Sequence, residues 1–300
     1  MNVIECKDLV KNYGGANALD HLSVFIKENT ITGLIGRNGA GKTTLLKIIA
    51  GFWKATSGEV KVFNRQPFNN LIVSANSIFV DDMMDFTSAL TIKELLDEAK
   101  TFYPNWDHDL AEGLLNYFEF NPNQSHQSLS KGKKSTYNMI IGLASKCALT
   151  IFDEPTTGMD AAVRKDFYRA LLKDYIQSPR TIIISSHHLD EVEDLLEDVL
   201  LIHDGKTLLH LSIEELKEYA VKISGRTALV MQYLDNKEVI YKEEINSETC
   251  SVIVRNNFPH ESVKRLGITV SSVKPSDLCV YLTSQSKGGI DDVFSKRESV

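Results

Sequence analysis

The sequence predicts an α/β protein with a largely parallel, covered sheet, followed by a small second domain that is α+β or rich in β-strands. Apolar runs of strand length alternate with amphipathic helical segments over much of the chain, which is typical of parallel βαβ units. One such run meets a glycine-rich loop that leads into a helical segment. We expect two domains, residues 1–212 and 213–300, in line with roughly 150 residues per domain. After about Ile213 the composition changes to β-rich pieces with turn signals between them, namely TALVMQYL, SVIVR and LCVYLTS.

The first strands are predicted from apolar and polar residues that alternate. This pattern occurs in VIECKDLVKNY and again in HLSVFIKEN, as in strands with one buried face. TITGLIG is an apolar run that predicts a buried strand, and the glycine-rich loop follows it. The segment KTTLLKIIAGFW comes next with apolar residues at helical spacing, so we expect a strand, a loop and a helix in that order.

The segment from about Leu90 to Ser128 is predicted to be helical in blocks. Thr91, with Glu94 three residues later, forms a capping pattern ahead of one helix. DHDLAEGLLNYFEF predicts a second amphipathic helix, and a third is expected to run from Ser130.

Strands and helices alternate again after this block. ALTIFDEP and TIIISSH have the length and apolar character of buried strands. VRKDFYRALLKDYIQ and LDEVEDLLEDV have helical patterns. Their alternation extends the predicted parallel sheet.

The composition fits a globular protein of a reducing cytosol. Lys and Arg number 33 and Asp and Glu 40, a net charge of −7, which argues against a surface that follows nucleic-acid phosphates. The four cysteines stand far apart without a CxxC pair, so neither a disulfide framework nor a zinc site is expected. The start, MNVIECKDLV, lacks the apolar core of a signal peptide, and there is no apolar run of about 18 residues. Any membrane role is therefore expected to come through a partner.

Residues 36–43, Gly-Arg-Asn-Gly-Ala-Gly-Lys-Thr, match G-x-x-x-x-G-K-[ST] at every fixed position. The glycines let successive backbone N–H groups turn toward phosphate oxygens, and the positive end of the next helix points to the same anion. Lys42 can reach the β- and γ-phosphates, and Thr43 offers a hydroxyl to Mg²⁺. The alternative is a plain glycine turn that caps a helix. The position between a buried strand and an amphipathic helix favours a nucleotide site.

Two acids end the apolar strand 149–152. Ligands of such sheets bind at the carboxyl edge of the strands. Asp153 is therefore expected to hold Mg²⁺ through water, and Glu154 to orient and polarise the attacking water as general base. The alternative is an N-cap acid before a turn at Pro155, which the phosphate loop upstream makes less favourable.

His187 follows the strand TIIISS. It is expected at the carboxyl edge of the same sheet, where it can face the γ-phosphate. His188 is adjacent and could be confused with it. A lone histidine is more often structural, but the position after this strand favours a functional role.

Together these segments resemble the nucleotide-binding subunit of an ATP-binding cassette (ABC) transporter, over roughly residues 2–210 and with the motifs in the family's order. The resemblance implies a P-loop NTPase fold of the ABC type with an inserted helical subdomain at about residues 82–145. It implies that Tyr13 stacks on adenine, that Asp160 belongs to the D-loop, and that His187 is the switch histidine. The other motif positions are the Walker A residues Gly36, Arg37, Asn38, Gly39, Ala40, Gly41, Lys42, Thr43 and Thr44 and the Walker B acids Asp153 and Glu154.

Residues 129–133 read LSKGK, where the usual signature of the family is Leu-Ser-Gly-Gly-Gln. The resemblance implies that Ser130 and Gly132 bind the γ-phosphate of ATP held by the opposite subunit, through a hydroxyl and a close backbone N–H. Lys131 and Lys133 replace a glycine and the glutamine, and we expect both to add positive charge beside that anion. The alternative is an N-capped basic helix, in which the serine is only a cap.

The family's Q-loop position falls on Asp82, counted back from Leu90 and Thr91. Asp81 is the neighbouring possibility. A carboxylate can contact Mg²⁺ or its bound water, although its side chain is shorter than the usual glutamine or glutamate.

The resemblance implies an ATP-binding and ATP-hydrolysing subunit that powers a membrane transporter, and it points to bacterial exporters of the YtrB-like group. The implied cofactors are ATP and Mg²⁺. The implied partners are a second ABC subunit, identical or paralogous, and an integral membrane permease, which would hold this subunit at the cytoplasmic face of the membrane. No nucleic-acid partner is expected. The permease is expected to dock on the helical segment from about Asp82 to Tyr117, whose aromatic residues include Phe86, Phe102, Tyr103 and Trp106.

Two other functions stay open at this point. One is a soluble ABC-family ATPase without a role in transport. The other is a nucleotide-sensing regulatory module, which the altered signature and Asp82 leave possible but which Lys42 and Glu154 argue against. The second domain contains no constellation of residues with an assignable chemistry.

Overall fold

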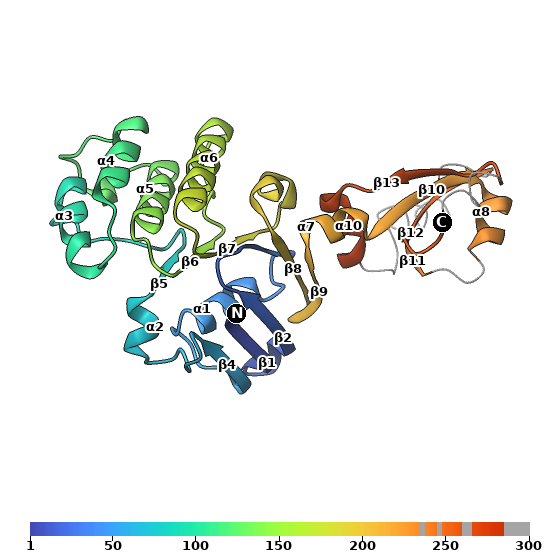
Figure 1. The fold of residues 1–300 in the computed structure, drawn as a ribbon, viewed down its shortest axis with the longest axis horizontal. Helices are drawn as coiled ribbons and strands as arrows, with labels where there is room; N and C mark the ends of the chain where they lie inside the picture. The colour runs from blue at the N-terminus through green and yellow to red at the C-terminus, as the bar shows by residue number, and fades with distance from the viewer. Residues whose placement is uncertain (235–237, 245–247, 260–265, 285–300) are drawn as a thin grey trace, which may run out of the picture. The chain divides into compact units, whose positions relative to one another are not determined.

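The structure is a computed structural model that describes residues 1–234, 238–244, 248–259 and 266–284. The chain divides into two compact units, Met1–Ile213 and Glu214–Val300 (Figure 1). No helix in the described parts of the chain combines the length and the apolar character needed to cross a membrane.

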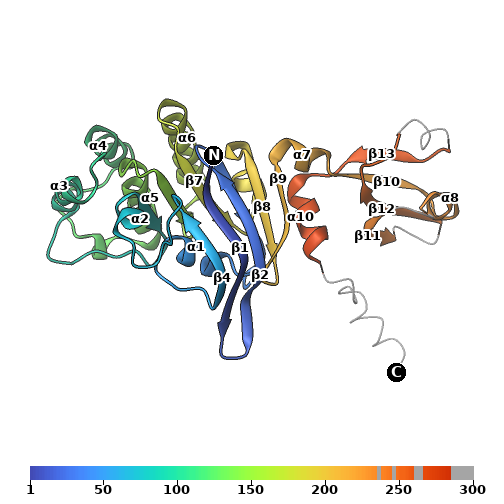
Figure 2. The same cartoon turned by 60° about the horizontal axis from the view of Figure 1, so that its bottom comes forward.

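Two sheets form the framework of the first unit. The smaller is antiparallel with the order β2-β1-β4 (Figure 2). The larger has the order β5-β6-β7-β3-β8-β9, parallel except for β9, which forms a hairpin with β8. The strands are β1 (Asn2–Tyr13), β2 (Ala16–Lys27), β3 (Ile31–Ile35), β4 (Ser57–Val62), β5 (Ser77–Val80), β6 (Leu149–Asp153), β7 (Thr181–Ser186), β8 (Asp198–His203) and β9 (Lys206–Ser212).

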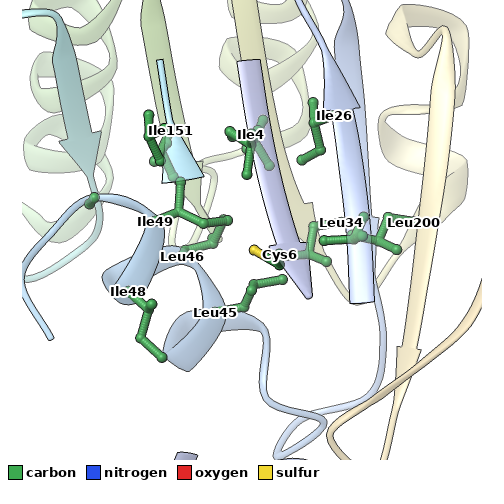
Figure 3. Close-up of a cluster of buried hydrophobic side chains, with 14 of the residues drawn as sticks. Ile4, Cys6, Ile26, Leu34, Leu45, Leu46, Ile48, Ile49, Ile151 and Leu200 are labelled. Atoms are coloured by element: carbon green, nitrogen blue, oxygen red, sulfur yellow. The ribbon is translucent and has the colours of Figure 1, made fainter. Parts of the chain in front are cut away.

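Helix α1 (Lys42–Ile49) lies between these two sheets. Its apolar side chains meet residues of both sheets in one buried cluster (Figure 3). Each fully buried aliphatic side chain of this kind contributes about 1.5–3 kcal/mol, so the cluster holds the helix against both sheets. Labelled members are Leu45, Leu46, Ile48 and Ile49 of α1, Ile4, Cys6 and Ile26 of the smaller sheet, and Leu34, Ile151 and Leu200 of the larger.

Helices cover the opposite face of the larger sheet. Neighbouring residues of a strand point to opposite faces, and Ile151 of β6 packs toward α1 while Phe152 packs toward α5 (Lys131–Ala144). A Cβ at Gly142 of α5 would lie only 2.6 Å from the ring of Phe152, so the helix and the strand are in close contact. Three more helices belong to this layer: α3 (Ile92–Phe102), α4 (His108–Tyr117) and α6 (Ala161–Gln177).

The helix starts follow their capping residues. Thr91 and Glu94 form the predicted capping box, with the Thr91 hydroxyl accepting from the Glu94 N–H and the Glu94 carboxylate from the Thr91 N–H. Asn70 caps the short helix α2 (Leu71–Ala75). Each cap satisfies backbone donors that a helix start leaves without partners.

The segment predicted as a helix over LDEVEDLLEDV is instead two 3₁₀ turns, η2 (Leu189–Glu191) and η3 (Glu193–Leu195). Leu189, Val192 and Leu195 are buried, and their spacing of three residues matches the period of a 3₁₀ helix. A third 3₁₀ turn, η1 (His126–Ser128), precedes α5.

The second unit has an antiparallel sheet with the order β11-β12-β10-β13. Its core contains Val221, Ile223, Val230, Cys250, Val252, Val254 and Ile268. The strands are β10 (Ala220–Arg226), β11 (Val239–Glu244), β12 (Thr249–Arg255) and β13 (Thr269–Ser272), and the helices are α7 (Ile213–Glu218), α8 (Thr227–Tyr233) and α10 (Pro275–Thr283).

Two of the three pieces predicted to be β-rich here are helices. TALVMQYL forms α8, with Val230, Tyr233 and Leu234 toward the core at helical spacing. LCVYLTS lies in α10, which begins with Pro275, a favoured first residue of a helix. SVIVR is part of β12. Short apolar runs do not separate helix from strand by pattern alone, and the segments of α8 and α10 are both of this kind.

Candidate nucleotide-binding site

The phosphate loop joins the end of β3 to the start of α1. A Cβ at Gly36 would lie 2.5 Å from the Ile202 carbonyl oxygen, and one at Gly41 would lie 2.4 Å from that of Ala18. Gly41 also has a φ of 103°, which side-chain-bearing residues rarely adopt. Only glycine therefore fits at these two positions, where the loop passes against neighbouring strands.

Lys42 is the first residue of α1 and is only 5% exposed. Its ammonium group donates to the Gly36 carbonyl oxygen at 2.7 Å. It also lies 3.1 Å from Glu154 Oε1, so the lysine closes the loop and reaches the end of β6. Of the other loop residues, Ala40 is buried, Thr44 is half-buried, and Arg37, Asn38, Gly39 and Thr43 are exposed.

Asp153 is buried at the end of β6, opposite Ser185 in the parallel register of β6 and β7. Ser185 Oγ donates to Asp153 Oδ1 at 2.6 Å and accepts from the Glu154 backbone N–H at 2.9 Å. The serine therefore orients both acids. It was not among the residues predicted from the sequence, because its role depends on which strands are neighbours.

Glu154 lies between a cation and a histidine. Besides Lys42, its carboxylate contacts His187 Nδ1 at 2.8 Å. Its backbone has a φ of 47°, a conformation that costs a residue with a side chain of the order of 1–3 kcal/mol and that occurs often at functional sites. The ring of His188 lies 4.0 Å from that of His187, tilted by 47°, and the backbone of His188 is bonded to the Ser186 hydroxyl. The structure thus brings together Lys42, Glu154 and His187. Of the two adjacent histidines, His187 makes the contact with Glu154.

The two aspartates after β5 face different partners. The sequence favours Asp82 for the Q-loop contact, but it is Asp81 whose charge interacts with that of Asp153. Burial raises the pKa of Asp81, with the nearby charge of Asp153 adding to the rise and Lys47, 3.8 Å away, opposing it. Asp82 Oδ2 lies 3.6 Å from Lys131 Nζ. Of the two aspartates, Asp81 is therefore the one with an electrostatic link to Asp153, and Asp82 stays a prediction for the Q-loop contact.

The signature segment begins α5. Ser130 is its N-cap and accepts from the Lys133 N–H at 3.4 Å. A Cβ at Gly132 would lie 2.6 Å from the Gly158 carbonyl oxygen, so this glycine allows the helix to touch the loop before α6. The exposed Lys131 is near Asp82.

Lys133 makes its contacts within the helical layer. Its ammonium group donates to the carbonyl oxygens of Phe118 at 2.5 Å and Glu119 at 3.3 Å, and it lies 4.7 Å from the centre of the Phe120 ring. The end of a helix carries partial negative charge, and Lys133 neutralises that charge at the end of α4. In this structure the charge of Lys133 is therefore engaged within the helical layer.

Two further predicted residues have contacts of their own. Asp160 is the N-cap of α6 and accepts from the N–H groups of Ala162 and Val163 at 3.0 and 2.9 Å. Tyr13 lies at the end of β1, half-exposed, with its ring edge-on to Trp53.

No group of three or more His, Cys, Asp or Glu side chains able to hold a metal occurs among the residues that the structure describes. Mg²⁺ in nucleotide sites is commonly held by one or two protein oxygens, with phosphates and water supplying the rest. Thr43 and Asp153 provide two such oxygens at adjoining element ends, and the bond from Ser185 holds the carboxylate. The residues present fit this cation.

Comparisons with known proteins agree with this geometry. A family model described as ABC transporter matches residues 19–157. The ABC transporter ATP-binding protein YtrB of Bacillus subtilis is 31% identical over 74% of this chain and 76% of its own length. The bacitracin transport ATP-binding protein BcrA of Bacillus licheniformis is 33% identical over 81% of this chain and 79% of its own. A solved dimeric bacterial ABC transporter cassette has a similar fold, with a TM-score of 0.62 and 22% identity over 70% of this chain and 98% of that one.

Proposed function

The chain belongs to the ABC transporter family as an ATP-hydrolysing, ATP-binding subunit, and we propose that it drives an exporter by ATP-dependent pairing with a second cassette. The observation that carries the proposal is the contact of Glu154 with both Lys42 and His187. A base, a phosphate-binding cation and a base-orienting histidine then lie at one edge of one sheet.

The proposed chemistry begins with Lys42. Its ammonium group exchanges Glu154 for the γ-phosphate, which leaves the Glu154 carboxylate free to orient and polarise the attacking water. His187 keeps its contact with Glu154 and positions it. Thr43 and Asp153 would hold Mg²⁺, which would supply positive charge to the phosphate groups when bound. Before ATP binds, the ammonium group of Lys42 therefore holds the Glu154 carboxylate.

The proposed dimer places the signature of one subunit over the ATP of the other. Ser130 offers its hydroxyl and the backbone at Gly132 its N–H, while Tyr13 stacks on adenine from the half-exposed position described above. The solved cassette with the similar fold is itself a dimer. Asp160 fixes the start of α6 beside this surface.

The permease is proposed to dock on the helical layer, here the subdomain at about residues 82–145. Of the aromatic residues expected there, Phe102 is largely exposed, as is Met83. Phe86 packs on buried rings, and Tyr103 stacks on Trp106. Phe102 and Met83 are therefore the side chains proposed to contact the permease. It would hold the subunit at the cytoplasmic face of the membrane, and the second unit, Glu214–Val300, is proposed as an accessory domain.

Transport outward is proposed from the LSKG form of the signature, which resembles that of bacterial exporters. Among the relatives, BcrA is named for bacitracin transport. A regulatory module that binds nucleotide without hydrolysis is not favoured, because it has no use for a base held at 2.8 Å from an orienting histidine.

The proposal is tested by Mg-ATP binding and hydrolysis. Glu154→Gln keeps ATP binding and loses about 100-fold or more in turnover, as expected for a general base, whereas Lys42→Ala loses tight Mg-ATP binding. Glu197→Gln is the matched control, because Glu197 bonds the Tyr175 hydroxyl just before β8, away from the carboxyl edge of the sheet. Normal turnover in the Glu154 variant would show that another group is the base.

A further inference from the structure

The segment 81–85 carries three aspartates, and each contacts a different element. Asp81 lies 3.8 Å from Lys47 of α1, the helix after the phosphate loop. Asp82 lies 3.6 Å from Lys131 at the start of α5. Asp85 lies 3.2 Å from His126 in η1. We call residues 81–85 the acidic segment, and it connects the nucleotide-binding helix with the signature.

The anchors of the acidic segment differ in burial. Asn138 of α5 donates to the carbonyl oxygens of Asp81 at 3.3 Å and Met84 at 3.0 Å, and the His126 ring that contacts Asp85 is fully buried. By contrast, the side chain of Asp82 is 43% exposed and that of Lys131 is 63% exposed. Exposed ion pairs are weak and are screened by salt. The contact between Asp82 and Lys131 is therefore the anchor that separates most readily.

Lys131, the first residue of α5, lies beside two loops of the site. A Cβ at Gly158 would lie 3.2 Å from Lys131 Cγ, so the aliphatic part of the lysine runs along the loop that follows Glu154. Its ammonium group reaches the acidic segment, and its backbone lies within the signature. A lysine at this place can exchange one anion for another without moving the helix that carries it.

We propose that Asp82 and Lys131 form a latch, which holds the signature lysine in the nucleotide-free subunit and opens when the γ-phosphate of the partner's ATP attracts it. The latch rests on the proposed function, with the ATP held between two copies of this chain. A triphosphate carries more negative charge than one carboxylate, so it displaces Asp82 once the dimer closes. Opening removes one anchor of the acidic segment, and the ATP state of the partner is thereby transmitted to the start of the helical layer.

The test measures ATP-driven dimerisation of the Glu154→Gln protein. Analytical ultracentrifugation gives the dimer fraction over a range of Mg-ATP concentrations. Asp82→Asn frees the lysine and lowers the ATP concentration for half-maximal dimer about two- to fivefold, the range of an exposed ion pair. Lys131→Gln removes the cation and raises that concentration at least about tenfold. In the double variant the gain from Asp82→Asn vanishes, because it acts only through Lys131.

The matched control is the exposed pair of Asp97 and Lys100 in α3, 3.2 Å apart. Asp97→Asn and Lys100→Gln leave the ATP dependence unchanged. The midpoint temperature of unfolding of the nucleotide-free proteins stays the same in all variants. A change in the ATP dependence then comes from the latch and not from a loss of stability. If Asp82→Asn has the same effect with and without Lys131, or has none, the latch is refuted while the dimer stands. If the Glu154→Gln parent forms no dimer with ATP, the latch between two copies of this chain is refuted, while pairing with a paralogous cassette, and with it the proposed function, is tested separately by recovery of partners from native membranes.

Discussion

Replacing Ser185 with alanine tests how the sheet prepares the metal-binding acid. The variant loses the donor 2.6 Å from Asp153 Oδ1 and the acceptor 2.9 Å from the Glu154 N–H. Both Ser185 and Asp153 are buried, so water cannot easily replace the lost partner. Groups that orient a metal ligand typically change metal affinity by about 10- to 100-fold. We therefore expect the Mg²⁺ concentration for half-maximal hydrolysis to rise by about that factor.

The assay is ATP hydrolysis at saturating nucleotide over a range of Mg²⁺ concentrations. The control is Ser145→Ala, which removes another buried hydroxyl, bonded to Gly142 at 2.8 Å and away from the acids. Nucleotide binding measured without Mg²⁺ should be equal in both variants. An unchanged Mg²⁺ dependence in Ser185→Ala would refute the reasoning, because Asp153 would then be oriented without this bond or would not hold the metal.

Two further predictions concern stability. Asp174 is buried and pairs with Arg180 at 2.8 Å and with Lys146. Asp174→Ala leaves the buried Arg180 without its carboxylate and should lower the free energy of unfolding, measured with urea, by about 3–5 kcal/mol. A loss below about 1 kcal/mol would contradict a buried ion pair. Burial lowers the pKa of His126 below its ordinary 6.5, against the opposing effect of Asp85. The unfolded chain then binds more protons at low pH, so stability should fall as the pH drops from about 7.5 to about 5.5. The fall should be shallower in His126→Gln, and equal slopes would show that another group titrates.

Much of the site was predictable because it depends on local pattern. The phosphate loop lies between a buried strand and an amphipathic helix, and both patterns can be recognised in the residues on either side of the loop. The same holds for Asp153 and Glu154, which end a continuously apolar strand. Where a residue's partner lies within its own strand, loop or helix, spacing along the chain is enough.

The rest depends on contacts between distant segments. Ser185 orients Asp153 only because β6 and β7 are neighbours in register. A one-residue step at the end of a strand turns a side chain to the other face, so the sequence could not decide between Asp81 and Asp82. In the sequence, Lys133 is one of several lysines in a basic segment. Its contact with the Phe118 carbonyl oxygen at the end of α4 depends on the packing of two helices.

The measurement that tests the central claim most directly is recovery of partners from native membranes. The Glu154→Gln protein is tagged, given ATP and purified from gently solubilised membranes, with Lys42→Ala as the control that cannot hold the nucleotide. The account predicts that a polytopic membrane protein is enriched with the first protein and not with the second. Recovery of soluble partners alone, still dependent on ATP, would contradict the role in transport and leave the ATPase.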